Sequence, residues 1–325
     1  MIIVQTPLRV SLFGGGTDFP KYFEEHGGCV LSTAIDKYIF VTIKERFDDK
    51  LRIGYTKTEM VDDLSEIGHE LIREALKKTN ITKGVEVTTM GDIPSEGSGL
   101  GSSSTVTVGS LQAMYTLRGD LVSADRLAQE ACEIEIDILG KPIGIQDQYI
   151  AAFGGLRFIE FPPNGRITAQ RLKLDPDLIR ALNDELLLFF TGVTRSSAAI
   201  LKEQKSNIED RIQILTSMKQ IAQNAKDELQ KGNIDAIGDC LHESWYLKRQ
   251  LASRISNGYL DDMYQAARDA GAVGGKITGA GGGGFILLFC PYQKQKKLRN
   301  ALSKLQELPF KLEQDGSKVI FNYHR

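Results

Sequence analysis

The segment PSEGSGLGSSS, residues 94–104, places three glycines and then three consecutive serines between a predicted strand and a predicted helix. The strand covers residues 85–90, and the helix runs from residue 102 to about residue 117. Small side chains let consecutive backbone N–H groups approach an anion, and the N-terminus of the helix adds the positive end of its dipole. The segment therefore predicts a phosphate cradle, although a plain loop whose serine caps the helix is the structural alternative.

Glycine is concentrated at two further places in the chain, residues 14–16 and residues 274–284, and thirteen of the 32 glycines fall in these three windows. The segment KITGAGGGG, residues 276–284, contains GxGxxG but leads straight into a strand, which excludes a dinucleotide-binding turn. We expect it to bring backbone close to a ligand or to the cradle. The segment RVSLFGGGTDF, residues 9–19, has a cation at Arg9 suited to a phosphate and a carboxylate at Asp18 suited to sugar hydroxyls.

The composition excludes several other classes of protein. The 325 residues carry 40 basic and 42 acidic side chains, so the formal charge of −2 does not favour a nucleic acid or an anionic membrane as partner. The four cysteines form no CxxC pair, which favours neither a zinc site nor a disulfide framework. No segment has the pattern of a signal peptide or a membrane span, so we expect a globular cytoplasmic protein.

The arrangement of predicted elements indicates an α+β protein with two domains. The turn-forming cluster FPPNG, residues 161–165, suggests a boundary between domains at residues 1–165 and 166–325. Two strand pairs are predicted as hairpins, one turning at Asp48 and Asp49 and one at Asp315 and Gly316. Residues 196–270 read as mostly helical, with their Lys and Glu residues on a solvated face.

Together, the three glycine windows resemble the motifs of the GHMP kinases, the superfamily of galactokinase, homoserine kinase, mevalonate kinase and phosphomevalonate kinase. They occur here in the order in which that family has them. The resemblance implies an N-terminal mixed α/β domain with a left-handed crossover, a ferredoxin-like C-terminal domain, and an active site between them. It also implies that the protein is an ATP-dependent carbohydrate kinase that uses Mg²⁺.

The same resemblance implies roles for particular residues. The ATP phosphates would be bound by Pro94, Gly97, Ser98, Gly99, Leu100, Gly101, Ser102, Ser103 and Ser104. Mg²⁺ would be held by Ser103 and Glu135, with Glu133 as a neighbouring alternative to Glu135. In the segment GIQDQ, residues 144–148, Asp147 would be the catalytic base. Arg9 would lie near the transferring phosphate or the sugar.

The departures from the sugar-kinase pattern bear on the substrate. Galactokinase-like members carry a Glu-His pair where this chain has Gly15 and Gly16, which leaves room for a larger or anionic substrate. The segment GGGTDFP, residues 14–20, resembles that of the branch that phosphorylates the anomeric hydroxyl of D-glycero-D-manno-heptose 7-phosphate. Enzymes of that branch give a 1,7-bisphosphate, which is used for GDP-heptose and surface polysaccharide. The expected substrate contacts are Gly15, Gly16, Thr17, Asp18, Gly281 and Gly282. A second anion site for the 7-phosphate is expected at Arg195, Ser196 and Ser197.

Two alternatives stay open at this point. A fucokinase-like sugar 1-kinase carries a related signature and would accept a neutral deoxysugar. A galactokinase-like regulator could bind ATP and sugar without turnover, although the presence of Asp147 argues against it. The sequence predicts a small-molecule sugar phosphate as partner and does not predict an oligomeric state.

Overall fold

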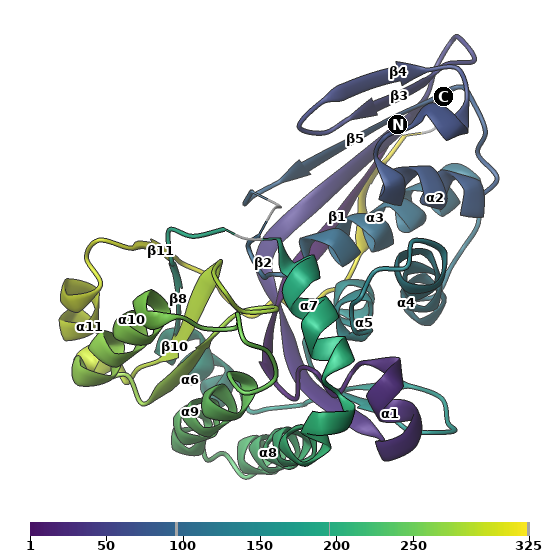
Figure 1. Cartoon of the computed structure of the whole chain (residues 1–325). Helices are drawn as coiled ribbons and strands as arrows, with labels where there is room; N and C mark the ends of the chain where they lie inside the picture. The colour runs from purple at the N-terminus through teal and green to yellow at the C-terminus, as the bar shows by residue number, and fades with distance from the viewer. Residues whose placement is uncertain (95–96, 195, 324–325) are drawn as a thin grey trace.

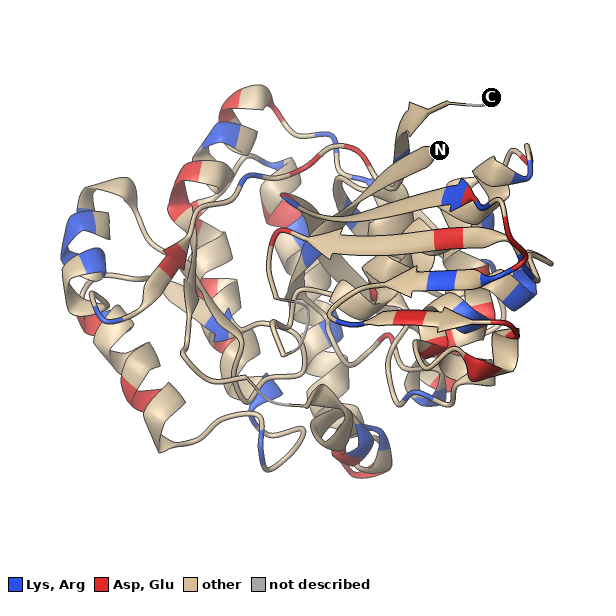
Figure 2. Cartoon of the chain, turned by 90° about the horizontal axis from the view of Figure 1, so that it is seen from above, with Lys and Arg blue, Asp and Glu red and all other residues tan. Residues whose placement is uncertain are grey.

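The computed structural model describes residues 1–94, 97–194 and 196–323. It contains two β-sheets, each with helices packed against it, and the two sheets lie in different halves of the molecule (Figure 1). Basic and acidic residues are interspersed over both halves (Figure 2). Within the described ranges, no helix combines the length and the apolar character needed to cross a membrane.

The larger sheet is built on two long strands. Its strand order is β12-β1-β2-β5-β3-β4, and β6 pairs with a second part of β2 and with β7. The bounds of these strands are β1 Ile2–Phe13, β2 Gly28–Glu45, β3 Leu51–Gly54, β4 Thr58–Val61, β5 Val85–Gly91, β6 Leu156–Phe161, β7 Thr168–Arg171 and β12 Lys318–Asn322. From Thr6 onward every residue of β1 is buried, because neighbouring strands and helices cover both of its faces.

Helices from the first half of the chain cover the larger sheet. They are α1 Pro20–His26, α2 Glu70–Lys78, α3 Ser102–Leu117, α4 Ala124–Cys132 and α5 Gln146–Phe153. The structure confirms both predicted ends of α3. After α4 the chain continues directly into a π-helical segment, η2 Glu133–Ile138.

The smaller sheet has the strand order β11-β8-β10-β9 and is antiparallel throughout. Its strands are β8 Leu186–Phe190, β9 Gly274–Ile277, β10 Phe285–Phe289 and β11 Gln306–Leu308. The helices of this half are α6 Pro176–Glu185, α7 Ser197–Ser206, α8 Ile212–Gln230, α9 Asp235–Lys248, α10 Gly258–Asp269 and α11 Gln295–Ala301. From β8 onward the chain runs strand, helices, strand, strand, helix, strand, which is the ferredoxin-like pattern that was expected.

Both predicted hairpins are wrong. The strand after Asp48 and Asp49 is β3, but β5 lies between it and β2 and pairs with β3 in parallel. The two strands on either side of Asp315 and Gly316 belong to different sheets, since β11 pairs with β8 and β12 pairs with β1. The expected domain boundary at residue 165 stays a prediction, although β7 and β12, which follow it, both join the larger sheet.

The two halves share their hydrophobic core. Along β10, Phe285, Leu287 and Phe289 belong to the same buried cluster as β1 and β2. The alternate residues Ile286 and Leu288 pack in a second cluster with Trp245 and the helices of the C-terminal half. Because side chains alternate between the faces of a strand, β10 joins both clusters and fixes the position of the smaller sheet relative to the larger one.

Candidate active site

A cavity of about 960 Å³ lies where the three glycine windows meet. Its walls come from β1, from the turn at residues 14–18, from the cradle at the start of α3 and from residues 139–147. The start of α7 and the loop between β9 and β10 complete it. Segments that are far apart in the sequence therefore surround one space.

The signs of the φ angles alternate along the cradle, as they do in an anion-binding nest. Gly97, Gly99 and Gly101 have φ angles of 70°, 72° and 83°. Among the described non-glycine residues only Asn80 has a positive φ, so Ser98 and Leu100 between these glycines have the ordinary sign. Alternation of left-handed and right-handed residues turns successive N–H groups toward one side, where they can bind an anion. Gly101 immediately precedes α3, so the N-terminus of that helix faces the same space.

The third glycine window packs directly against the cradle. A Cβ atom on Gly279 would come within 2.7 Å of the Gly99 Cα, and one on Gly284 would come within 2.6 Å of the Ser98 carbonyl oxygen. The hydroxyl of Thr278 donates to that same carbonyl at 3.2 Å. Gly279 and Gly284 are therefore needed for close packing against the cradle.

The structure separates the two candidate metal-binding glutamates. The Ser103 hydroxyl donates to Glu135 Oε2 at 2.8 Å, and Glu135 is fully buried at the cavity wall. Glu133 instead pairs with Lys78 at 2.6 Å and is partly exposed. Residues two apart on a helix point to roughly opposite sides, which explains why these two carboxylates face different ways. Burial raises the pKa of Glu135 above its usual value, although its hydrogen bond from Ser103 opposes this.

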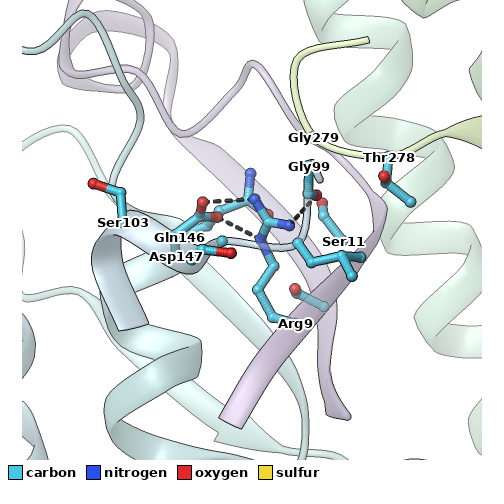
Figure 3. A network of polar contacts seen from close by, with 12 residues as sticks. Arg9, Ser11, Gly99, Ser103, Gln146, Asp147, Thr278 and Gly279 are labelled. Carbon is cyan, nitrogen blue, oxygen red and sulfur yellow. Dashed lines mark hydrogen bonds and ion pairs between the residues drawn. The ribbon is translucent and has the colours of Figure 1, made fainter. Parts of the chain in front are cut away.

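Arg9 connects the predicted base to the cradle (Figure 3). Its Nε and Nη2 atoms donate to the two carboxylate oxygens of Asp147 at 2.7 and 2.6 Å. Its Nη1 atom donates to the Gly99 carbonyl at 2.6 Å. We expected the guanidinium of Arg9 to bind a phosphate, but it makes a bidentate contact with the Asp147 carboxylate. Both residues line the cavity.

Asp18 is buried at the floor of the cavity. It accepts hydrogen bonds from the backbone of Gly16 at 2.9 Å and from the side chain of Gln146 at 3.0 Å. Burial raises its pKa, and the nearby Asp147 raises it further. A Cβ atom on Gly144 would lie 2.1 Å from the Asp18 carboxylate, so only a glycine fits at position 144.

The remaining predicted residues divide into those that line the cavity and those that do not. Gly97, Ser98, Gly99, Gly101, Ser102, Ser103, Ser104, Gly15, Gly16, Ser196, Ser197 and Gly281 line it. The cavity-lining residues that the structure describes do not include Pro94, Leu100, Thr17 or Gly282.

Three of these four have structural contacts instead. Leu100 is fully buried in the core. The hydroxyl of Thr17 donates to the backbone of Gly14 and Cys29, and the N–H of Gly282 donates to Ile255. Arg195 lies outside the described residues.

Sequence reasoning missed three lysines that line the cavity. Lys248 is 5% exposed, and its amine donates to the backbone carbonyls of Ile277 and Gly279. Lys276 is 2% exposed, and its amine donates to the backbone carbonyls of Ser11 and Leu12. Lys141 donates to the Ser103 hydroxyl at 3.3 Å. The prediction that the lysines of residues 196–270 lie on a solvated face is wrong for Lys248. For Lys276 the sequence did hold a signal of burial, because it is a charged residue inside an otherwise apolar strand.

The buried amine of Lys276 is expected to make stability depend on pH. Burial lowers its pKa to about 7, with a further contribution from Arg9, while Asp18 acts in the opposite direction. Between that value and the pKa of an unfolded lysine, near 10.4, the unfolded chain binds the proton more strongly. The free energy of unfolding of the wild type, relative to that of Lys276→Met, should therefore rise from pH 7 to pH 9.5. Urea titrations of both proteins across this range measure it, and a constant difference would contradict the lowered pKa.

Two family models match the chain. The model described as GHMP kinases N terminal domain matches residues 67–155, and the model described as GHMP kinases C terminal matches residues 225–308. The first match contains the cradle and Asp147, and the second contains the loop between β9 and β10.

Individual proteins match over nearly the whole chain. A D-glycero-alpha-D-manno-heptose 7-phosphate kinase from Campylobacter jejuni is 33% identical, and the match covers 94% of each protein. A bifunctional fucokinase/GDP-fucose pyrophosphorylase from Arabidopsis thaliana is 27% identical over 95% of this chain, which spans 32% of that longer protein. The crystal structure of a D-glycero-D-manno-heptose 1-phosphate kinase from Bacteroides thetaiotaomicron superposes with a TM-score of 0.84 at 27% identity, and the match covers 100% of both chains.

Proposed function

This chain belongs to the GHMP kinases, and from that premise we propose that it transfers a phosphoryl group from ATP to the anomeric hydroxyl of D-glycero-D-manno-heptose 7-phosphate. The product would be the 1,7-bisphosphate, an intermediate for GDP-heptose and surface polysaccharide. One observation carries the proposed reaction: a paired carboxylate, Asp147, lines the same cavity as a phosphate cradle and is tied to that cradle through Arg9.

Asp147 can act as the base while it stays paired with Arg9. A carboxylate has about four lone-pair positions, and the two donors of Arg9 occupy two of them. The others can accept the proton of a sugar hydroxyl that enters the cavity. Arg9 fixes the orientation of the carboxylate, so the base is positioned before the substrate binds.

The residues around the cradle fit ATP with Mg²⁺. The nest of residues 97–101 and the start of α3 offer N–H groups to phosphate oxygens. Glu135 is buried with a raised pKa, so a cation would stabilise its charged form. One carboxylate and one hydroxyl suit Mg²⁺, which usually keeps several waters and phosphate oxygens as its other ligands. When bound, the metal neutralises charge on the phosphates, and Ser103 and Glu135 would hold it.

The substrate assignment rests on the relatives and on the turn after β1. Two of the similar proteins are named heptose phosphate kinases. Gly15 lines the cavity without a positive φ, so the backbone does not require glycine there, and its missing side chain leaves space. Thr194, Ser196 and Ser197 line the cavity, and we propose that they bind the 7-phosphate together with Arg195.

A coupled assay of ADP release over a panel of sugars tests this proposal. The panel contains heptose 7-phosphate, heptose 1-phosphate, heptose, fucose, galactose, mannose and homoserine, each with Mg-ATP. We expect the highest kcat/KM with heptose 7-phosphate. The names of the two heptose relatives differ in the position of the phosphate, so the first two sugars decide between these substrates. Turnover of fucose alone would support a fucokinase-like enzyme, and turnover of unphosphorylated sugars alone would overturn the proposal.

The second anion site has its own test. Arg195→Ala should raise the KM for the phosphorylated sugar and leave the KM for ATP nearly unchanged, because the proposed 7-phosphate site is separate from the cradle. An effect confined to ATP would remove Arg195 from this role.

A further inference from the structure

Three buried polar atoms, all on residues that line the cavity, lack a hydrogen-bond partner among the described residues. They are Ser11 Oγ, Gln146 Oε1 and Gln204 Nε2. The three residues are 7%, 8% and 7% exposed, and all three line the cavity. Burying a polar atom without a partner costs free energy, so folded proteins rarely leave three such atoms around one cavity. Their placement calls for a ligand that supplies the missing hydrogen bonds.

The orientation of Gln146 is fixed by its neighbour. The amide nitrogen donates to Asp18 at 3.0 Å, and only a donor can face that carboxylate. The amide oxygen therefore faces elsewhere as an acceptor, and a sugar hydroxyl could donate to it. Figure 3 shows Gln146 beside Asp147, which places this acceptor close to the proposed base.

Ser11 lies on the same face of β1 as Arg9, because side chains two positions apart on a strand point the same way. A Cβ atom on Gly15 would lie 3.6 Å from Ser11 Oγ and 3.6 Å from the Gln146 amide nitrogen. Gly15 thus stands between these two side chains, and its lack of a side chain keeps the space between them open.

Gln204 reaches the cavity from α7, the helix that crosses the front of the molecule between its two halves (Figure 1). Ser197, Leu201 and Gln204 all line the cavity. Their spacing of four and then three residues puts them on one face of the helix. The amide of Gln204 therefore projects from the wall that also carries the proposed 7-phosphate loop at its start.

We propose that Ser11, Gln146 and Gln204 together recognise the hydroxyl groups of the sugar and determine specificity for a polyhydroxylated substrate. The inference rests on the proposed function in that the sugar must enter this cavity. It does not depend on which sugar that is. A hydroxyl can both donate and accept, so neighbouring hydroxyls on a sugar match one acceptor, one donor and one hydroxyl in the protein. A substrate with few hydroxyls would leave these atoms unpaired and bind weakly.

The variants Ser11→Ala and Gln204→Met test this because each removes an unpaired atom. Each is expected to raise the KM and the calorimetric Kd for the sugar about tenfold, the effect of losing one hydrogen bond. Affinity for ATP should change less than about twofold, and the melting temperature of the ligand-free protein should stay equal or rise. This opposite effect on stability and binding separates a ligand contact from a structural contact. Ser206→Ala and Gln213→Met, at exposed positions, are the matched controls.

Sugar analogues that lack one hydroxyl complete the experiment. If Ser11 or Gln204 contacts a given hydroxyl, the variant and the deoxy analogue should lose less together than the sum of their separate losses. Unchanged sugar affinity in both variants, an equal loss of ATP affinity, or a lower melting temperature of the ligand-free variants would each overturn the inference. Failure of the heptose assignment is a distinct result, because the same coupling can be measured with any sugar that the enzyme does phosphorylate.

Discussion

Asp147→Asn should lower kcat by about 10² to 10⁴-fold while the Kd for ATP stays nearly constant. The amide has nearly the same shape as the carboxylate but cannot accept the proton of the attacking hydroxyl. ATP is expected at the cradle, and the hydrogen bonds that link Asp147 to the described part of the cradle pass through Arg9, so binding should survive. Single-turnover kinetics with Mg-ATP measures the chemical step, and fluorescent-nucleotide titration measures the binding.

Asp137→Asn is the matched control, because Asp137 is exposed on η2 and does not line the cavity. It should behave as the wild type. Near-normal turnover by Asp147→Asn would remove Asp147 from the role of base. A large loss of ATP affinity would instead mean that the pair with Arg9 chiefly maintains the shape of the cradle.

Glu135→Gln should raise the Mg²⁺ concentration needed for half-maximal activity by about 10 to 100-fold or more, the range found when groups supporting a metal ligand are removed. Glutamine keeps the shape of the side chain but loses the charge that would bind the cation. The ligand-free variant should unfold at an equal or higher urea concentration, because it no longer buries a charged carboxylate. Titrating Mg²⁺ at saturating ATP, alongside urea denaturation, measures both effects.

Glu133→Gln provides the comparison that decides between the two glutamates. Glu133 pairs with Lys78 on the outer side of η2, so its loss should leave the Mg²⁺ requirement within about twofold of wild type, as for a surface ion pair. The assignment made from the Ser103 contact fails if Glu133→Gln shows the larger change in the Mg²⁺ requirement.

Local chemistry made the cradle predictable from the sequence. Glycines at alternate positions, three serines and the apolar pattern of the following helix all lie within one short stretch, and the structure has α3 at the predicted Ser102–Leu117. The GHMP kinase fold was likewise predictable, because its three glycine windows occur in the family's order. All but two of the predicted phosphate-binding residues line the cavity. Their contacts with ATP stay predictions.

The failures involve contacts between distant segments. No residue near Asp48 indicates that β5 will lie between β2 and β3, because strand order depends on contacts across the whole sheet. The burial of Lys248 was equally hidden, since its carbonyl partners lie about thirty residues later, beside the third glycine window. The unpaired atoms of Ser11 and Gln204 become visible only when β1 and α7 are placed around one cavity.

The pairing of β12 with β1 has a consequence for synthesis on the ribosome. Ile2 pairs with Asn322, so β1 emerges long before the strand that covers its outer edge. At about 5 to 20 residues per second, that edge stays open for on the order of tens of seconds. An open strand edge can recruit a strand from another chain, and nascent chains on a polysome lie close together. We therefore expect co-translational aggregation to begin at β1, and slower translation of the C-terminal half to lower the yield of active enzyme.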